Sequence, residues 1–148
     1  MRYHHVLLVI HLLSAAIWVG GHIVLLVGTV PAAVANSDKR PILDFEASYG
    51  RIGLSSLLFL VASGIAMALN YGVMPNTWFT FSNPIETIVS IKLILLLITV
   101  GLAISAQLKV VPGVVRGTLG LKTLVWHITG VTLIGISMLV LGTFVRFG

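Results

Sequence analysis

Four long apolar stretches, separated by short polar connections, dominate the chain. About 20 mostly apolar residues are needed to cross a bilayer, and four segments meet this requirement: residues 3–32, 52–71, 86–108 and 122–145. The prolines fall at or outside the ends of these segments, where helices tolerate them. The pattern predicts an all-α integral membrane four-helix bundle, formed as a single transmembrane domain over residues 1–148.

The composition agrees with a membrane protein and excludes several kinds of site. Of the 148 residues, 57% are hydrophobic and 9% are charged, and the mean hydropathy is +1.09, whereas soluble domains carry roughly a quarter charged residues. Cysteine is absent, which excludes disulfides, covalently attached c-type haem and thiolate metal sites. Because the four acidic residues lie in connections or at a helix end and no phosphate-binding loop occurs, hydrolase and nucleotide-driven functions are not expected.

The net charge of +5 is concentrated in two of the three connections. Residues 33–51 and 109–122 carry three basic residues each, whereas residues 71–84 carry none. By the positive-inside rule the two basic connections face the cytoplasm, and both termini then lie outside. The first apolar run is longer than the about 7–15 residues of a signal-peptide core, so we expect it to remain as a helix. These features predict a multi-pass protein of the bacterial inner (plasma) membrane.

Histidines interrupt the first apolar stretch on one helix face. His4, His11, Trp18 and His22 follow one another at spacings of seven, seven and four residues, which return to the same side of a helix. An ionisable side chain in hydrocarbon is costly and usually serves a function. Because His11 and His22 lie about 16 Å apart along the axis, they predict two sites stacked through the membrane rather than one metal centre.

The fourth stretch offers a partner for the inner of these histidines. His127 lies at nearly the same depth as His22, and glycines lie beside both residues. Two imidazoles on facing helices are how a helical bundle holds a b-type haem. We therefore predict His22 and His127 as ligands of the haem iron, with Arg51, Arg116 and Lys122 placed to meet the haem propionates.

A second set of polar residues lies in the outer half of the predicted bundle. His11 and Lys92 lie at similar depths, and His11 could ligate or support a second haem site. Imidazole and thioether ligands also suit copper(I). The alternative copper set is His4, His5, His11, Met67 and Met138. Structural explanations compete with both sites: solvation of the terminal histidines, snorkelling of Lys92, and packing of the methionines and inner histidines.

Three of the apolar stretches resemble a known family over roughly residues 5–108. "HLLSAAIWVGG" has a histidine, six residues, a tryptophan and then glycines; "RIGLSSLLFLVASGIAMAL" has a small-Gly-Ile pattern; and "IVSIKLILLLITVGLA" carries a lysine. These motifs resemble the CopD-like membrane proteins, named for copper resistance, and the related HemJ-type protoporphyrinogen oxidases. The resemblance implies an all-helical membrane fold, b-type haem in the HemJ branch, copper handling in the CopD branch, and His11 with Lys92 as the functional pair.

Four functional hypotheses follow from these observations. The first is a membrane b-type cytochrome that binds haem b between its helices and transfers electrons in quinol- or porphyrinogen-linked redox chemistry, as a haem-dependent oxidoreductase. The second is a copper-handling or copper-transport protein of the CopD type. The third is a HemJ-like enzyme that oxidises a porphyrinogen, and the fourth is an accessory bundle without a cofactor. Expected partners are membrane lipid and a homodimer or larger membrane complex, with no role for nucleic acid.

Overall fold

The computed structural model confirms an all-α bundle with four helices long and apolar enough to cross a membrane. It describes residues 2–147, and the side chains of residues 3–144. Within this part of the chain no strand occurs. The protein is therefore a multi-pass membrane protein. Its candidate spans are Tyr3–Ala35, Arg40–Asn70, Pro84–Val115 and Leu121–Phe144.

The first two spans form a helical hairpin. Its first arm runs through α1 (Arg2–Val24), the π-helical turn η1 (Leu25–Thr29) and the short α2 (Val30–Ala35), and its second arm is α3 (Arg40–Asn70). Pro31 lies in the first turn of α2. A proline ring clashes with the carbonyl four residues back in a regular α-helix, and the wider π turn before Pro31 accommodates it, so the first arm continues to Ala35.

The last two spans form a second hairpin of the same construction. α4 (Pro84–Ser105) passes into a π-helical turn, η3 (Ala106–Val110), then into α5 (Val111–Val115), and α6 (Leu121–Phe147) returns. Pro112 follows the π turn, as Pro31 does in the first hairpin. The two hairpins are thus structural repeats of one another, which the sequence analysis did not identify.

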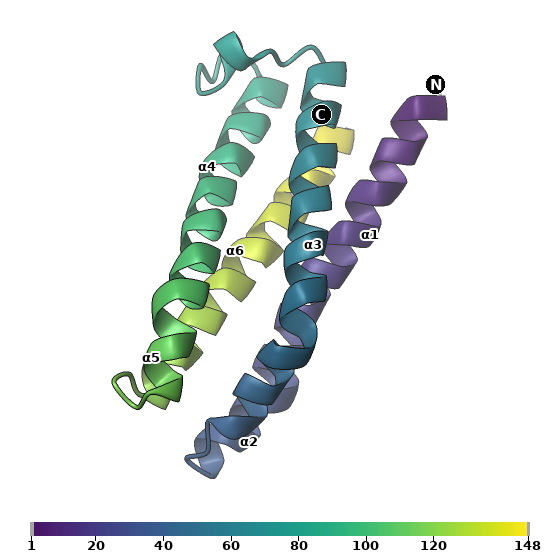
Figure 1. Ribbon diagram of the computed structural model, residues 1–148. Helices are drawn as coiled ribbons and strands as arrows, with labels where there is room; N and C mark the ends of the chain where they lie inside the picture. Colours follow the sequence, from purple (N-terminus) through teal and green to yellow (C-terminus); the bar gives the residue numbers. More distant parts are fainter. Residues whose placement is uncertain (1, 148) are drawn as a thin grey trace.

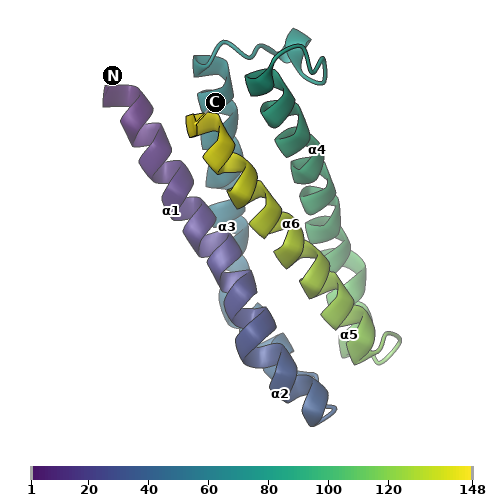
Figure 2. The same cartoon turned by 180° about the vertical axis from the view of Figure 1, so that it is seen from behind.

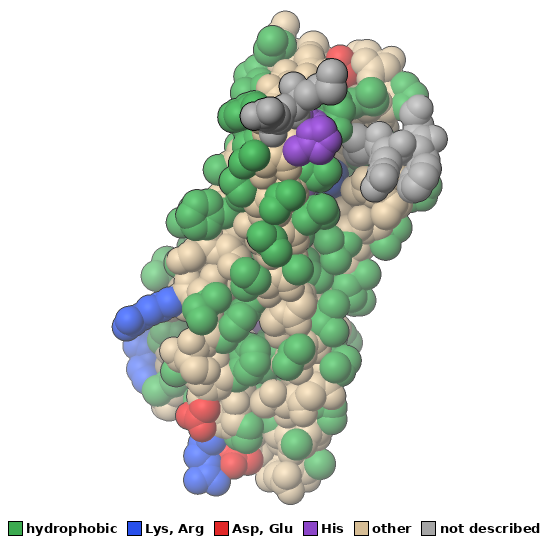
Figure 3. Space-filling view, turned by 90° about the vertical axis from the view of Figure 1, so that its right-hand side faces the viewer, with side chains coloured by type: hydrophobic (Ala, Val, Ile, Leu, Met, Phe, Trp, Pro, Cys, Tyr) green, Lys and Arg blue, Asp and Glu red, His purple; other side chains and the backbone are tan. Residues whose placement is uncertain are grey.

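Both hairpins turn at the same end of the molecule (Figure 1). The termini and the connection that contains η2 (Pro75–Thr77) lie at the other end. On the face in Figure 3, hydrophobic side chains cover the middle, and acidic and basic side chains gather toward the lower end, where α2 lies. The two basic connections therefore share one end, as predicted, while the side of the membrane that they face stays a prediction.

The predicted connections were too long, and this is a correction. Residues 33–51 were expected to lie between helices, but α3 begins at Arg40; residues 109–122 were expected to do so, but α5 ends at Val115. Hydropathy marks where a helix is apolar, not where its hydrogen bonding ends. Helix ends at the membrane interface carry polar residues whose long stems still lie along apolar surface.

The helices pack in pairs rather than as a closed ring of four. α1 packs along α3, α4 packs along α6, and the two hairpins meet mainly through α1 and α6 (Figures 1 and 2). In contrast, α3 and α4 have almost no direct contact. The bundle is therefore open on its α3–α4 side.

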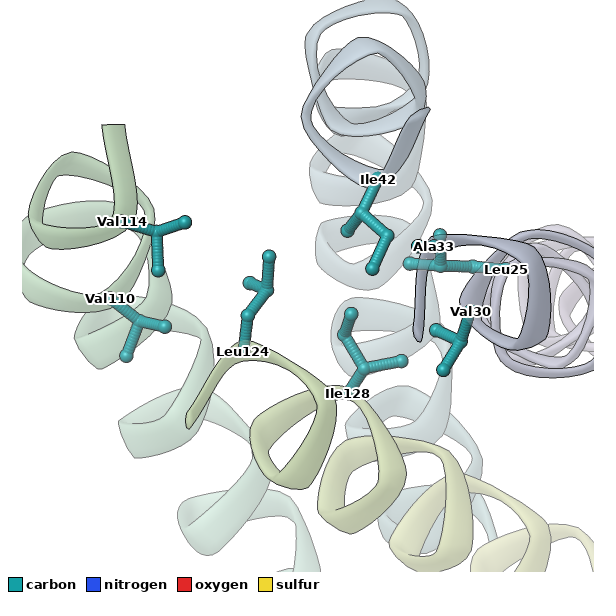
Figure 4. Packing of buried hydrophobic residues seen from close by; sticks show 8 residues of the cluster. All are labelled: Leu25, Val30, Ala33, Ile42, Val110, Val114, Leu124 and Ile128. Carbon is teal, nitrogen blue, oxygen red and sulfur yellow. The ribbon is translucent and has the colours of Figure 1, made fainter. Parts of the chain in front are cut away.

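Two clusters of buried apolar side chains hold the bundle together. One lies near the hairpin turns, where both hairpins contribute to it (Figure 4). Its members are Leu25, Val30, Ala33, Ile42, Val110, Val114, Leu124 and Ile128. The other joins Trp18 and Val19 of α1 to Leu57 of α3 and Val131 of α6. Lys39 adds a polar link between the hairpins, because its Nζ donates a hydrogen bond to the Val114 carbonyl.

Candidate cofactor site

A cavity of about 80 Å³ lies inside the bundle, on the hairpin-turn side of its middle. Both histidines predicted as haem ligands line it, His22 from α1 and His127 from α6. All four long arms contribute to its wall, which contains the polar or aromatic side chains Trp18, Glu46, Tyr49 and Gln107. The structure thus brings the two inner histidines to one internal space.

The imidazole of His22 is held in one orientation. Its Nδ1 lies 2.8 Å from the Trp18 carbonyl oxygen, and because a carbonyl can only accept, Nδ1 carries the hydrogen. The ring also rests against the Trp18 indole, with ring centroids 4.3 Å apart and planes 54° apart. Nε2 of His22 is therefore left with its lone pair.

The imidazole of His127 is held by the neighbouring helix. Its Nε2 donates to the Leu102 carbonyl of α4 at 2.8 Å, so its Nδ1 keeps the lone pair. Each inner histidine therefore has one nitrogen bonded to a backbone carbonyl and the other available. This is the arrangement found in metal-ligating histidines, where the second hydrogen bond fixes the ring and its tautomer.

The glycines beside these histidines have different surroundings. A Cβ added to Gly21 would overlap the ring of Tyr49, whose hydroxyl donates a hydrogen bond to the Ile17 carbonyl. A Cβ on Gly20 or Gly130 would meet no atom within 4 Å. The space beside Gly21 is therefore occupied by Tyr49 and is closed to a cofactor.

A hydrogen bond crosses the open side of the bundle. Gln107 of η3 donates through Nε2 to Glu46 Oε1 of α3 at 2.8 Å, and Glu46 interacts electrostatically with His22. Beyond this pair lies a groove of about 500 Å³ between α3 and the η3–α5 segment. Of the predicted propionate partners, Arg51 lines this groove, whereas Arg116 Nε donates to a carbonyl of its own helix.

The predicted shared face of α1 is confirmed by its contacts with α3. His4 Nε2 lies 3.3 Å from the Tyr71 hydroxyl, and His11 Nδ1 lies 3.1 Å from Ser63 Oγ. Ser63 gives its hydroxyl hydrogen to backbone carbonyls of α3, so its oxygen accepts from His11 and the Nε2 of His11 keeps a lone pair.

His11 and Lys92 lie near one another in the outer half of the bundle. The charge of Lys92 acts on His11, and the Nζ of Lys92 lies 3.4 Å from the position of a Cβ on Gly142. Likewise, His11 Cε1 lies 3.1 Å from the position of a Cβ on Gly64. No hydrogen bond joins Lys92 to another described residue. Two glycines thus provide the space in which these two ionisable side chains sit inside the bundle.

The alternative copper set is spread over several elements. His4 packs edge-on against Tyr71, with ring centroids 5.3 Å apart, and Met67 and Met138 are half-buried on α3 and α6. Within residues 2–147, no three His, Asp or Glu side chains group together as they would to hold a metal ion. A copper site made of histidine and methionine stays a prediction.

Comparisons with protein-family models, with curated proteins and with solved structures gave no match. Because a helical bundle hosts many functions, function is inferred from the chemistry of the site.

Proposed function

We propose that the protein is a membrane b-type haem protein that transfers electrons. The observation that carries this proposal is the pair of inner histidines, which come from helices of different hairpins and line one cavity. Each has one nitrogen bonded to a backbone carbonyl, at 2.8 Å in both cases, and the other nitrogen available to iron. Histidine ligands are commonly oriented in this way.

The residues present fit haem in their chemistry, and the bundle must open to admit it. Two imidazoles without thiolates are a haem-ligand set. The enclosed cavity of about 80 Å³ holds only a few water molecules, whereas sites for larger ligands occupy about 300–1,000 Å³. Binding therefore requires the hairpins to separate where α3 and α4 barely touch. The adjoining groove of about 500 Å³ lies on that side.

Each polar residue of the site has a role in this proposal. When bound, haem supplies reversible one-electron chemistry. His22 and His127 hold the iron, and the carbonyls of Trp18 and Leu102 keep the two rings in place. Arg51 offers positive charge on the groove wall to the propionates. The apolar cluster near the hairpin turns keeps water away from the haem and so favours a low dielectric around it.

The same proposal gives the protein an orientation and a second site. By the positive-inside rule, the hairpin turns lie on the cytoplasmic side of a bacterial inner membrane and both termini lie outside. The second site comprises His11 and Lys92 in the outer half, about 16 Å from the inner site along the helix axis. A quinol is the proposed electron donor, because electrons then enter from the membrane itself. Assembly as a homodimer or a larger membrane complex is part of the same proposal.

The test is a dithionite-reduced minus oxidised visible spectrum of the detergent-purified protein, with a pyridine haemochrome assay on the same sample. We expect a b-type band and stoichiometric haem. His22→Ala and His127→Ala should each abolish the low-spin spectrum of the inner haem, while His5→Ala, at the outer end, should leave it unchanged. An unchanged spectrum in both inner variants would remove these ligands from consideration. A colourless protein that binds copper would favour the copper alternative instead.

A further inference from the structure

The groove on the α3–α4 side has features that haem ligation does not use. Its volume of about 500 Å³ is that of a small-molecule site, since these occupy about 300–1,000 Å³. Leu43 and Leu54 form one apolar wall, and Val111 and Val115 form the other. Both walls belong to the candidate membrane-spanning segments Arg40–Asn70 and Pro84–Val115, which suits a lipid-soluble ligand.

Small residues line one wall of the groove beside Glu46. Ala47 and Gly50 lie one turn apart along α3 and both line it. A Cβ on Gly50 would lie 3.2 Å from Glu46 Oε1, so the glycine leaves room for the Glu46 carboxylate at the groove.

A hydrogen-bonding pair stands between the groove and the internal cavity. Glu46 and Gln107 line both spaces, and they are joined by one hydrogen bond of 2.8 Å. No other described residue bonds to Glu46 Oε2 or to the carbonyl oxygen of Gln107. Two acceptors are therefore available to a ligand that carries hydroxyl donors.

The groove carries both acidic and basic side chains. Asp44, Glu46 and Arg51 line it, so its carboxylates outnumber its cations. A neutral hydroxyl can donate a charge-assisted hydrogen bond to the Glu46 carboxylate. A planar ring with hydroxyl donors and an apolar tail is the chemistry of a lipid-soluble quinol.

We propose that this groove binds a membrane quinol, with a ring hydroxyl donating to Glu46 and the tail lying along Leu54. The quinol then sits beside the cavity that His22 and His127 line, because Glu46 and Gln107 line both spaces. The inference rests on the proposed function only for the role of the quinol as electron donor. Binding of the quinol itself does not require haem.

The test is calorimetric titration of decylubiquinol, under argon, into the full chain in phosphatidylcholine nanodiscs, with empty nanodiscs subtracted. We expect saturable binding that Glu46→Gln and Gln107→Leu each weaken roughly tenfold. The matched control is Glu86→Gln, which makes the same chemical change on α4 at the opposite end of the molecule. Leu54→Trp, at a position 49% exposed, should fill the groove and weaken binding without disturbing the polar pair.

Binding as tight in Glu46→Gln, Gln107→Leu and Leu54→Trp as in the Glu86→Gln control would overturn the assignment, and so would the absence of saturable binding. Displacement of decylubiquinol by the anionic lipid phosphatidylglycerol would also overturn it, because the groove would then recognise a phosphate head group. Haem content is measured on each sample. Saturable quinol binding without haem would refute the proposed function and leave this inference standing, and haem without quinol binding would do the reverse.

Discussion

Gly21 on α1 faces the ring of Tyr49 on α3, and its replacement by alanine tests the packing of the first hairpin. The added Cβ would overlap the Tyr49 ring, so the ring must leave its notch. The hydroxyl of Tyr49 then loses its hydrogen bond to the Ile17 carbonyl. Gly20, the preceding residue, provides a matched control, because a Cβ there meets no atom within 4 Å.

The two substitutions are expected to change the free energy of unfolding in opposite directions. Overpacking at Gly21 costs about 1–3 kcal/mol, and loss of the tyrosine hydrogen bond costs about 1 kcal/mol more. Alanine in a helix recovers about 0.5–1 kcal/mol relative to glycine. Gly21→Ala should therefore destabilise the protein by about 1–3.5 kcal/mol. Gly20→Ala should stabilise it by about 0.5–1 kcal/mol, because only the helix-propensity gain applies.

The assay is unfolding by sodium dodecyl sulfate, followed by circular dichroism of the two variants and the parent protein in the same mixed micelles. A Tyr49→Leu background completes a double-mutant cycle, in which the smaller side chain should relieve most of the cost of Gly21→Ala. Equal unfolding midpoints for Gly21→Ala and Gly20→Ala would refute the packing of Tyr49 against α1. A cost of Gly21→Ala that persists unchanged in the Tyr49→Leu background would refute it as well.

Two further predictions concern the hairpin turns. The Arg40 side chain and amide donate hydrogen bonds to the Asp38 carboxylate, and they hold its pKa below the usual 3.8. The stability that this contact contributes is present above the unfolded-state pKa of Asp38. It is lost as the pH falls through the lower, folded-state pKa. The unfolding midpoint of the parent protein should thus fall more steeply below about pH 4 than that of Asp38→Asn, and parallel pH profiles would contradict this. Ser37 and Gly117 hold equivalent left-handed turn positions, with φ of 51° and 77°. Ser37→Gly should raise the free energy of unfolding by up to about 1 kcal/mol, and Gly117→Ser should lower it by a similar amount; the opposite ranking in the same assay would contradict the turn geometry.

The four spans could be predicted from the sequence because hydrocarbon imposes a single strong requirement on composition. The shared face of α1 followed equally directly from helix periodicity, and contacts of His4, His11 and Trp18 with α3 confirm it. Hydropathy could not locate the helix ends, because α3 begins among polar residues such as Arg40 and Asp44. Those residues satisfy their backbone within the helix and reach water with their side chains.

The parts of the site contributed by α3 and η3 were missed in the sequence. Glu46 and Gln107 were assigned to, or next to, connections, yet both line the cavity and bond to one another. Tyr49 fills a notch that looked like space for a cofactor. Whether these side chains point toward α1 and α6, and so line the cavity, depends on the rotation of their helices. That rotation depends on where α3 begins and on the π turn in η3.

The internal repeat was also missed, although a short signal exists: "VPAAV" from Val30 and "VPGVV" from Val111 occupy equivalent places in the two hairpins. Elsewhere, several equivalent positions of the two halves carry unlike residues. The shift in residue number that carries Pro31 to Pro112 also carries His11 to Lys92. It likewise carries Glu46 to His127.

A single chain can hold these unlike pairs, whereas a dimer of two identical hairpins cannot. His11 and Lys92 lie near one another in the outer half, and Glu46 and His127 line the same inner cavity. A dimer of two identical hairpins would instead bring two lysines, or two glutamates, to one depth, and like charges interact strongly where the dielectric is low. In a single chain, the two hairpins can carry different ionisable residues at the same depth of the bundle. The residues proposed for the two sites therefore include positions at which the two hairpins carry unlike side chains.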